Sequence, residues 1–417
     1  MSRIVMKFGG TSVANVERIK TVARHVKREV DAGHEVAVVV SAMSGATNQL
    51  VAWCRETAVL HDAREYDAVV ASGEQVTAGL LAIALQEAGI SARSYQGWQV
   101  PIRTDKAHGA ARIEAVPGEA LVSRLVDRQV PVIAGFQGIG PDERITTLGR
   151  GGSDTSAVAI AAAVEADRCD IYTDVDGVYT TDPRIENKAR RLDRVAFEEM
   201  LEMASSGAKV LQVRSVELAM VHNVRVLVRS SFVAPDAPEL LRANEPPGTL
   251  ICDEDEILEQ QVVTGIAYSK DEAQITLRRV ADKPGVAAGV FGPLAEASIN
   301  VDMIVQNISE DGRHTDITFT VPVADYERSL AILRGAESSI GYADLQGATD
   351  VGKVSVIGIG MRSHAGVAAA CFRALADRAI NIRAITTSEI KISVLIDAAY
   401  TELAVRTLHS LYGLDKA

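Results

Sequence analysis

Hydrophobic positions along the chain follow two spacings, and segments of the two kinds alternate. Residues 36–40 form a continuous apolar run, which is typical of a strand buried on both faces of a parallel sheet. Residues 13–29 place apolar side chains three and four positions apart, which predicts a helix with one buried face. Further short runs, at 99–102 and 130–136, are separated by helical segments. This order predicts an α/β fold with a mainly parallel sheet.

Small polar residues and glycines follow several of these predicted strands. The three loops concerned are 7–12, 41–48 and 147–156. In open α/β sheets, ligands bind at the carboxyl ends of the strands. We therefore expect the three loops to meet at one edge of the sheet and to form a site there.

The first loop, Lys7-Phe-Gly-Gly-Thr-Ser12, has two interpretations. It can be a phosphate cradle, in which the glycines expose backbone N–H groups, Lys7 adds a positive charge, and Thr11 or Ser12 caps the next helix. It can equally be an ordinary capped turn between a strand and a helix. The loop matches neither the P-loop nor the dinucleotide-binding fingerprint, so taken alone it leaves both interpretations open.

The loop at 147–156 gives the strongest signal for a site. Arg150 lies among three glycines and offers a planar fork that suits a carboxylate or a phosphate. Ser153 and Asp154 stand where a helix cap is expected, but capping does not explain the arginine. Glu74 can be an acid that stabilises the dipole of the helix it begins, or it can bind a ligand. Lys209 can contact a phosphate, or it can be a solvated surface lysine.

An internal repeat occupies the last third of the chain. Residues 285–300 recur 81 residues later as 366–381, with nine of sixteen positions identical. Each copy predicts strand, helix, strand, strand, helix, which suits a βαββαβ unit. The second copy ends one strand short, and we hypothesise that residues 249–262 supply the missing strand.

Prolines and acidic residues from position 235 onward mark a domain boundary. We expect an α/β domain at 1–234, a linker that contains the possible extra strand at 235–263, and the two repeats at 264–347 and 348–417.

Composition narrows the classes of partner. The net charge of −12 argues against nucleic acid or an anionic membrane as the main partner. Four scattered cysteines without a C-x-x-C pair suggest free thiols in a reducing, cytoplasmic compartment. Apolar runs such as 157–164 are too short to span a bilayer. The eight dispersed histidines form no zinc motif, so we expect no metal site made by the protein alone.

Taken together and in order, these motifs resemble those of the aspartokinases, a branch of the amino acid kinase family. The segments that carry the resemblance are Lys7–Ser12, Ser41–Thr47, Ser72-Gly-Glu74, Gly149–Ser156, Thr173–Tyr179 and Asp182-Pro-Arg184. The tandem repeat resembles a pair of ACT domains. The resemblance covers essentially the whole chain and implies an amino acid kinase-type three-layer αβα sandwich with a mainly parallel sheet, followed by two ferredoxin-like βαββαβ ACT domains.

The resemblance also implies an activity. Family members transfer the γ-phosphoryl group of ATP, with Mg²⁺, to the side-chain carboxylate of L-aspartate, which gives 4-phospho-L-aspartate and opens lysine, threonine and methionine biosynthesis. No homoserine dehydrogenase extension follows, so the chain resembles the monofunctional type.

By the same resemblance, Lys7 and Asp154 form the catalytic centre. The residues implied for ATP are Lys7, Phe8, Gly9, Gly10, Ser41, Thr173, Asp174, Tyr179, Asp182, Arg184, Lys209 and Val210. Those implied for aspartate are Ser41, Thr47, Glu74, Arg150, Gly151, Gly152 and Ser153. A carboxylate nucleophile is already ionised at neutral pH, since its pKa is about 4, so the reaction needs charge neutralisation and positioning rather than a general base.

ACT pairs bind amino acids, and we expect feedback inhibition by lysine, threonine or both. The effector residues implied are Asp282, Gly285, Val286, Ala287, Asn300, Asp302, Gln306, Asn381 and Ile382. The second copy reads Arg-Ser-His-Ala before Gly366 where the first reads Asp-Lys-Pro before Gly285, so its loop departs from the first. No methionine lies between Met220 and Met303, which favours a homodimer through the ACT domains over a separately started small subunit.

Two other functions remain open from the sequence. One is a kinase of the same fold that acts on acetylglutamate, glutamate, carbamate or UMP. The other is a catalytically silent amino-acid sensor that keeps the ACT pair.

Overall fold

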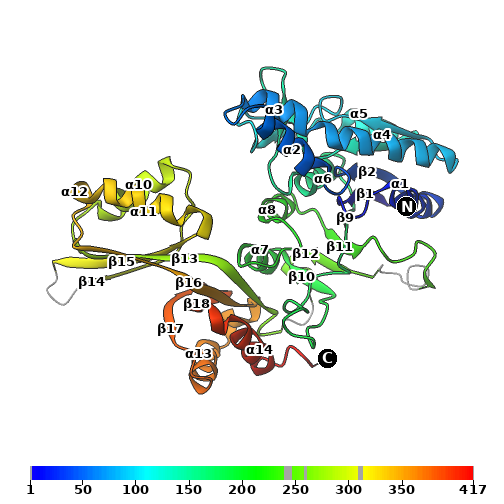
Figure 1. Ribbon diagram of the computed structural model, residues 1–417. Helices are drawn as coiled ribbons and strands as arrows, with labels where there is room; N and C mark the ends of the chain where they lie inside the picture. Colours follow the sequence, from blue (N-terminus) through cyan, green and yellow to red (C-terminus); the bar gives the residue numbers. More distant parts are fainter. Residues whose placement is uncertain (1, 239–246, 258–260, 309–312, 417) are drawn as a thin grey trace. The chain divides into compact units, whose positions relative to one another are not determined.

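The computed structural model describes residues 2–238, 247–257, 261–308 and 313–416, and it divides into two compact units (Figure 1). Unit 1 comprises residues 1–178, 191–204 and 209–258. Unit 2 comprises residues 179–190, 205–208 and 259–417.

Unit 1 is built on an eight-stranded sheet with the order β10-β12-β11-β9-β1-β2-β6-β3. The strands are β1 Arg3–Phe8, β2 Glu35–Val40, β3 Ala92–Tyr95, β6 Val130–Ala134, β9 Arg168–Thr173, β10 Arg194–Ala196, β11 Val226–Ser230 and β12 Thr249–Cys252. Neighbouring strands run parallel except at the β11–β12 pair, which is antiparallel. The expected mainly parallel sheet is confirmed.

Helices cover both faces of this sheet. They are α1 Val16–Asp31, α2 Ala46–Thr57, α3 Ala63–Val70, α4 Ser72–Glu87, α5 Glu119–Val126, α6 Gly152–Ala163, α7 Phe197–Ser205 and α8 Val213–Val221. A smaller sheet, β5-β4-β7-β8, joins Ile113–Ala115, Arg103–Thr104, Gln137–Ile139 and Ile145–Thr147. The three-layer αβα arrangement predicted from the sequence is therefore present.

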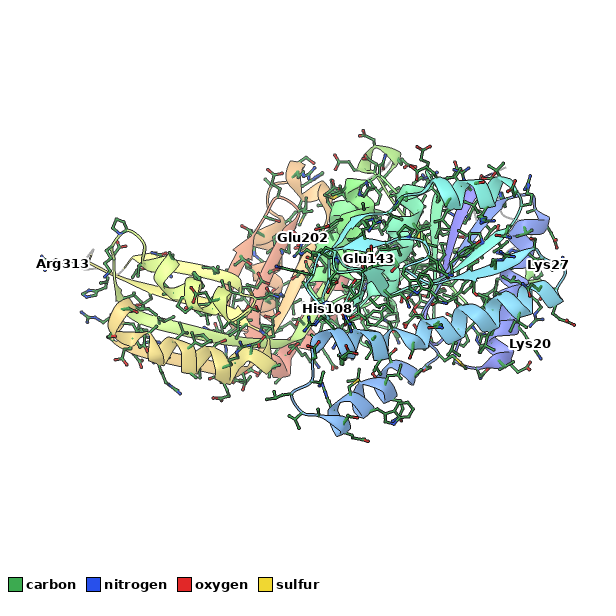
Figure 2. All side chains as sticks on the ribbon, turned by 90° about the horizontal axis from the view of Figure 1, so that it is seen from above. Lys20, Lys27, His108, Glu143, Glu202 and Arg313 are labelled. Atoms are coloured by element: carbon green, nitrogen blue, oxygen red, sulfur yellow. The ribbon has the colours of Figure 1, made fainter. Side chains whose placement is uncertain are left out.

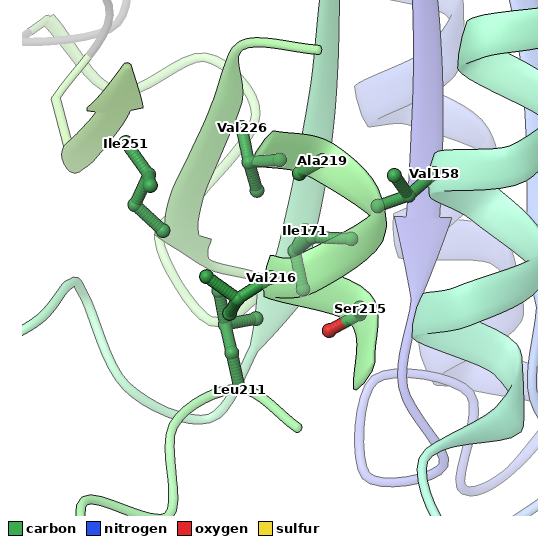
Figure 3. Close-up of a pocket in the computed structure, with 8 residues that line it drawn as sticks. All are labelled: Val158, Ile171, Leu211, Ser215, Val216, Ala219, Val226 and Ile251. Carbon is green, nitrogen blue, oxygen red and sulfur yellow. The ribbon is translucent and has the colours of Figure 1, made fainter. Parts of the chain in front are cut away.

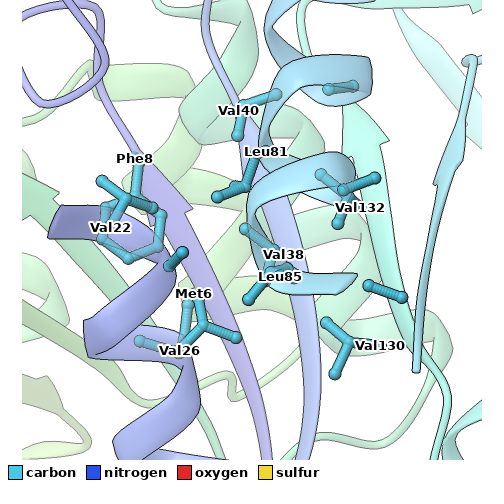
Figure 4. Close-up of a cluster of buried hydrophobic side chains, with 14 of the residues drawn as sticks. Met6, Phe8, Val22, Val26, Val38, Val40, Leu81, Leu85, Val130 and Val132 are labelled. Carbon is cyan, nitrogen blue, oxygen red and sulfur yellow. The ribbon is translucent and has the colours of Figure 1, made fainter. Parts of the chain in front are cut away.

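Alternation along β1 assigns its side chains to the two faces. Met6 and Phe8 enter a core cluster with side chains of α1 and α4 (Figure 4). Lys7 therefore points to the opposite face, where α6 lies. On that face an apolar group from α6, α8, β9, β11 and β12 packs around Val158 and Ile171 (Figure 3).

The capping expected of Thr11 or Ser12 is wrong. Helix α1 begins at Val16, and Asn15 caps it by accepting a hydrogen bond from the Arg18 N–H at 2.9 Å. The Ser12 hydroxyl donates instead to the carbonyl of Tyr172 at 3.4 Å. The glycine pair thus leads into a turn, and the helix follows several residues later.

Helices α3 and α4 form the one apolar stretch in the described part of the chain that could cross a membrane by length and composition, Ala63–Glu87. The expectation that every apolar run is too short fails for this segment. Half of its most apolar 18-residue window is buried inside the protein, and Leu81 and Leu85 lie in the core cluster of Figure 4. Its apolar character is therefore explained by packing.

Unit 2 contains a six-stranded antiparallel sheet with the order β14-β15-β13-β16-β18-β17. The strands are β13 Gly265–Ala281, β14 Asp302–Ile308, β15 His314–Val321, β16 Asp344–Ile357, β17 Ile382–Thr387 and β18 Lys391–Asp397. The helices are α10 Val286–Glu296, α11 Tyr326–Gly335, α12 Glu337–Ile340, α13 Val367–Asp377 and α14 Thr401–Leu411. The two copies of the repeat share this sheet, because β13 and β16 are long enough to serve both.

The hypothesis that residues 249–262 supply the missing strand of the second repeat is wrong. The strand that this segment forms belongs to the other sheet. β12, Thr249–Cys252, pairs with β10 and β11 in unit 1. The missing strand is the beginning of β13, where Gly265 to Ser269 pair with Ile357 to Lys353 of β16. β16 is a single strand that serves the end of the first repeat and the start of the second.

The two copies of the repeat have the same backbone conformation at their tightest turns. Gly285 and Gly366 are the left-handed N-caps of α10 and α13, with φ of +90° and +97°. Ser298 and Ala379, which are also equivalent in the repeat, adopt φ of +57° and +56° after those helices. Identical backbone demands at equivalent positions support a common origin of the two copies.

An ion cluster around the buried Lys353 and Glu272 lies where β13 and β16 pass from one copy to the other. The Lys353 ammonium contacts Glu272 at 2.9 Å and Asp302 at 2.7 Å. Burial by itself lowers the pKa of Lys353, but the charges of Glu272 and Asp302 raise that pKa above its ordinary value. Lys353 therefore stays charged inside the sheet.

We predict that Lys353→Ala destabilises unit 2, because it leaves the buried Glu272 carboxylate without its counter-ion. Loss of one partner of a buried pair costs about 3–5 kcal/mol, which a urea-unfolding curve followed by circular dichroism will measure. The matched control is Lys270→Ala, since Lys270 pairs with Glu402 on the surface of the same unit and should cost less than about 1 kcal/mol. Equal shifts for the two variants would contradict the prediction.

Candidate active site

A cavity of about 480 Å³ opens at the carboxyl edge of the main sheet in unit 1. The three glycine-rich loops expected to meet do meet here, together with α4 and β9. The residues that line the cavity are Lys7, Gly9, Gly10, Thr11, Ser41, Ala42, Met43, Ser44, Gly45, Thr47, Asn48, Glu74, Phe136, Gly149, Arg150, Gly151, Gly152, Ser153, Asp154 and Thr173.

Lys7 and Asp154 form an ion pair at the base of the cavity. The Lys7 Nζ lies 2.5 Å from the Asp154 Oδ1, and the two side chains are only 9% and 12% exposed. The pair joins the end of β1 to the first turn of α6. A charge-assisted contact in a poorly hydrated site holds the ammonium at one position, where it can meet an incoming anion.

The glycine pair after Lys7 allows two loops to come close together. A Cβ on Gly10 would lie 3.1 Å from the carbonyl oxygen of Ala42. The Gly9 N–H donates to the Tyr172 carbonyl at 3.2 Å, so the expectation that this N–H is free for a phosphate is wrong in this structure. Close approach, rather than a row of free donors, is what the glycines provide here.

Glu74 is a buried carboxylate on the first turn of α4, 3% exposed. Its Oε1 accepts a hydrogen bond from the Ala42 N–H at 3.0 Å, whereas its Oε2 is buried and has no partner among the described residues. Burial raises the pKa of Glu74 to about 7. A buried, unpartnered acceptor in a cavity wall is suited to a cationic ligand group.

The Arg150 loop is a tight turn that ends at a helix. Gly149 and Gly151 adopt φ of +77° and +71°, and a Cβ on Gly151 would lie within 2 Å of the Gln212 side chain. Gly151 is the N-cap of α6 and provides no side-chain cap, so the capping role considered for Ser153 and Asp154 is wrong. Both residues lie in the first turn and face the cavity.

Several residues expected to hold ATP lie elsewhere. Thr173 lines the cavity, but Asp174, Tyr179, Asp182, Arg184, Lys209 and Val210 do not. Asp182 accepts hydrogen bonds from Arg184 at 2.8 Å and from the Tyr268 hydroxyl at 3.1 Å. Both contacts are within unit 2, to which Tyr179, Asp182 and Arg184 belong.

The residues expected to hold an effector lie at three places in unit 2. Asp282, Gly285, Val286 and Ala287 surround the start of α10, Asn300, Asp302 and Gln306 lie at and on β14, and Asn381 and Ile382 lie at the equivalent start of β17. Val286 is buried in the core of the first repeat. Asp302 is engaged by Lys353, as described above.

Phe136 is a residue of the cavity wall that the sequence did not indicate. It follows β6 and adopts φ of +69°, a strained conformation for a residue with a side chain. Its N–H donates to the Ser156 hydroxyl at 3.1 Å. An apolar residue at the end of a strand is normally interpreted as core, so the sequence carried no signal for this role.

Comparisons with known proteins agree with this architecture. Residues 2–230 match the amino acid kinase family, and residues 275–337 and 354–412 each match an ACT domain. The chain is 52% identical over 416 residues to the aspartate kinase of Stutzerimonas stutzeri, covering 100% of this chain and 98% of that protein. It is 46% identical over 417 residues to the aspartokinase of Helicobacter pylori strain J99, covering 99% and 100%.

Solved structures give the same result. The crystal structure of E. coli aspartokinase III in complex with aspartate and ADP, in its R-state, aligns with a TM-score of 0.81 at 28% identity, covering 98% of this chain and 99% of that one. The same enzyme in complex with lysine and aspartate, in its T-state, aligns with a TM-score of 0.75.

Proposed function

The chain belongs to the amino acid kinase family, as an aspartokinase with two ACT domains, and from that premise we propose that it transfers the γ-phosphoryl group of ATP to the side-chain carboxylate of L-aspartate. The product is 4-phospho-L-aspartate, which enters lysine, threonine and methionine biosynthesis. We further propose a catalytic domain that extends beyond residue 234 to include β12, because that strand pairs within its main sheet, followed by two ACT domains that share β13 and β16.

The observation that carries this proposal is the arrangement of charges in the cavity. An amino acid presents an ammonium and a carboxylate close together, and the cavity presents Glu74 and Arg150. The unpartnered Glu74 Oε2 suits the ammonium, and the Arg150 fork suits the α-carboxylate. Thr47, Gly151, Gly152 and Ser153 then surround the rest of the substrate, and Ser41 lies between the two ligands.

The side-chain carboxylate of aspartate needs no general base, because it is ionised at neutral pH. What it needs is a neighbouring phosphoryl group held in line and neutralised. Lys7 is suited to contact that group from the base of the cavity, since Asp154 fixes its ammonium at 2.5 Å. Gly9 and Gly10 line the cavity beside Lys7, and we propose that the ATP phosphates lie against them, whereas the Phe8 side chain is in the core.

We assign Thr173, which lines the cavity, to the nucleotide, and on the family resemblance alone we propose the same for Asp174, Lys209 and Val210 of unit 1. Mg²⁺ would neutralise the phosphate charge. Among the described residues no three His, Cys, Asp or Glu side chains gather into a metal cluster, which suits a magnesium ion held mainly by phosphate oxygens and water. The Asp154 carboxylate pairs with the Lys7 ammonium and orients it.

For regulation, we propose that lysine, threonine or both bind to the ACT domains and inhibit the enzyme. The crystal structure of E. coli aspartokinase III with lysine supports an amino-acid effector of this kind. The start of α10, with Asp282, Gly285, Val286 and Ala287, offers a helix N-terminus to a carboxylate. Asn300, Asp302 and Gln306, and in the second copy Asn381 and Ile382, offer polar groups to the remaining atoms. We propose a cytoplasmic homodimer that associates through these domains.

We predict that Lys7→Ala folds and binds aspartate but loses turnover by roughly 10²–10³-fold, because the transferred group loses its charge partner. Hydroxylamine trapping of the acyl phosphate formed with ATP and aspartate measures this directly. Lys20→Ala is the matched control, since Lys20 is exposed on α1 (Figure 2) and 62% of its side chain is accessible. Trapped product at the unsubstituted level in Lys7→Ala would exclude the proposed role, and no product from the unsubstituted protein would exclude the activity.

We predict that aspartate binding strengthens as pH rises through 7. The ionised Glu74 pairs with the ammonium, and its pKa is about 7, so the dissociation constant for aspartate should be roughly tenfold higher at pH 6 than on the plateau above pH 8. Calorimetric titration across this range measures it. Glu74→Gln retains an acceptor for Ala42 but cannot ionise, and it should lose the pH dependence. The same pH profile in Glu74→Gln would show that another group is responsible.

We predict that Gln306→Ala desensitises the enzyme while its uninhibited turnover stays unchanged, and that Asp302→Asn does the same. Loss of one polar contact of about 1.4 kcal/mol raises the half-inhibiting effector concentration roughly tenfold. The assay is turnover against lysine, threonine and their mixture. Gln346→Ala, at an exposed position on β16 of the same sheet, is the control, and unchanged inhibition in Gln306→Ala and Asp302→Asn would refute the assignment.

A further inference from the structure

Asp67 is a fully buried carboxylate that lies outside the cavity lining. It is on α3, with 0% exposure, and its two oxygens accept hydrogen bonds from four donor groups. The donors are the Thr147 hydroxyl at 2.6 Å, the Thr147 N–H at 3.1 Å, the Gly109 N–H at 3.1 Å and the His108 Nδ1 at 2.8 Å. A buried charge held by this many donors organises the groups around it.

The donors come from two loops that meet beside Arg150. Thr147 is the last residue of β8 and precedes Arg150 by three positions. His108 and Gly109 lie in the loop between β4 and β5, and the Ala111 N–H donates to the Thr147 carbonyl at 2.9 Å. A Cβ on Gly149 would lie 3.2 Å from the Gly109 carbonyl oxygen. The backbone just before Arg150 therefore packs directly on the loop that Asp67 holds.

Arg214 holds the same two loops from α8. Its guanidinium donates to the Leu148 carbonyl at 2.9 Å and to the Ala111 carbonyl at 2.7 Å. On the other side of Arg150, the Gly152 N–H donates to the Gly149 carbonyl at 3.0 Å. The chain at Arg150 is thus fixed before and after the arginine, although the glycines on each side of it are conformationally free.

His108 (labelled in Figure 2) is the informative member of this group. A carboxylate only accepts, so the His108 Nδ1 carries the proton that binds Asp67. Its Nε2 is buried without a partner among the described residues, and an unsatisfied buried acceptor costs about 1–3 kcal/mol. The hydrogen bond to Asp67 is the contact that holds the His108 ring in this position.

We propose that Asp67 and His108 are positioning residues for aspartate binding, which act by holding the 147–149 backbone so that Arg150 presents its guanidinium to the substrate α-carboxylate. Neither side chain contacts the substrate. This inference rests on the proposed assignment of Arg150 to aspartate. Lost positioning should weaken aspartate binding and leave ATP binding and the transfer step largely intact.

The test compares His108→Ala with His108→Asn, whose side-chain amide can donate to Asp67 as Nδ1 does. We expect the dissociation constant and KM for aspartate to rise roughly tenfold in His108→Ala, with KM for ATP and kcat at saturating aspartate changed by less than about threefold. His108→Asn should restore most of the aspartate affinity. The matched control is Glu65→Gln, on the exposed face of α3, the helix that carries Asp67. It should leave all constants unchanged.

A double-mutant cycle with Arg150→Ala separates positioning from a general structural role. If His108 acts through Arg150, His108→Ala should have little further effect on aspartate affinity in the Arg150→Ala background. A full additional loss in that background, or an equal loss of ATP affinity, would overturn the positioning role. If Arg150→Ala leaves aspartate affinity unchanged, the assignment of Arg150 in the proposed function fails instead.

Discussion

The ion pair between Lys7 and Asp154 is the contact on which the site depends. It links the strand at the centre of the main sheet to the first turn of α6, which follows directly on the loop that carries Arg150. Lys7 can take this position because β1 alternates its side chains, so that Met6 and Phe8 enter the α1–α4 core while the residue between them faces α6. An ordinary two-residue period therefore places an ammonium at the base of a cavity. Around it, Glu74 and Arg150 complete a surface whose charges complement those of an amino acid.

Much of this arrangement could be predicted from the chain alone, because its causes are local. The continuous apolar run at 36–40 identified a buried parallel strand, and the glycine-rich loops after the strands identified the edge at which ligands bind. The repeat was detectable because equivalent positions require the same residue types, as Gly285 and Gly366 do at their left-handed caps. The aspartokinase family was identified from the order of its motifs, and the comparisons confirm it.

What could not be predicted depends on contacts between distant segments. The sequence near Ser12 offers a good helix cap, but tertiary contacts begin the helix at Val16 and leave Asn15 to cap it. The local sequence of β12 does not indicate which of the two large sheets the strand joins. Its pairing with β10 and β11 was therefore not predicted. Phe136 resembles a core residue, and Asp67 resembles any acid on an amphipathic helix. The residues around them are up to 80 positions away in the chain. The local spacing of hydrophobic residues gives no information about contacts at that separation.

The shared strands of the two ACT domains have a consequence for how such a pair can change over generations. Because β13 and β16 each run through both copies, no cut between the repeats leaves two complete modules. The two copies form one sheet, and deletion or exchange of either half would remove a central strand from the other. A substitution on a shared strand of one copy therefore changes the packing of the other copy as well. The two halves can diverge in their loops, as the segments before Gly285 and Gly366 have done, but their central strands must evolve together.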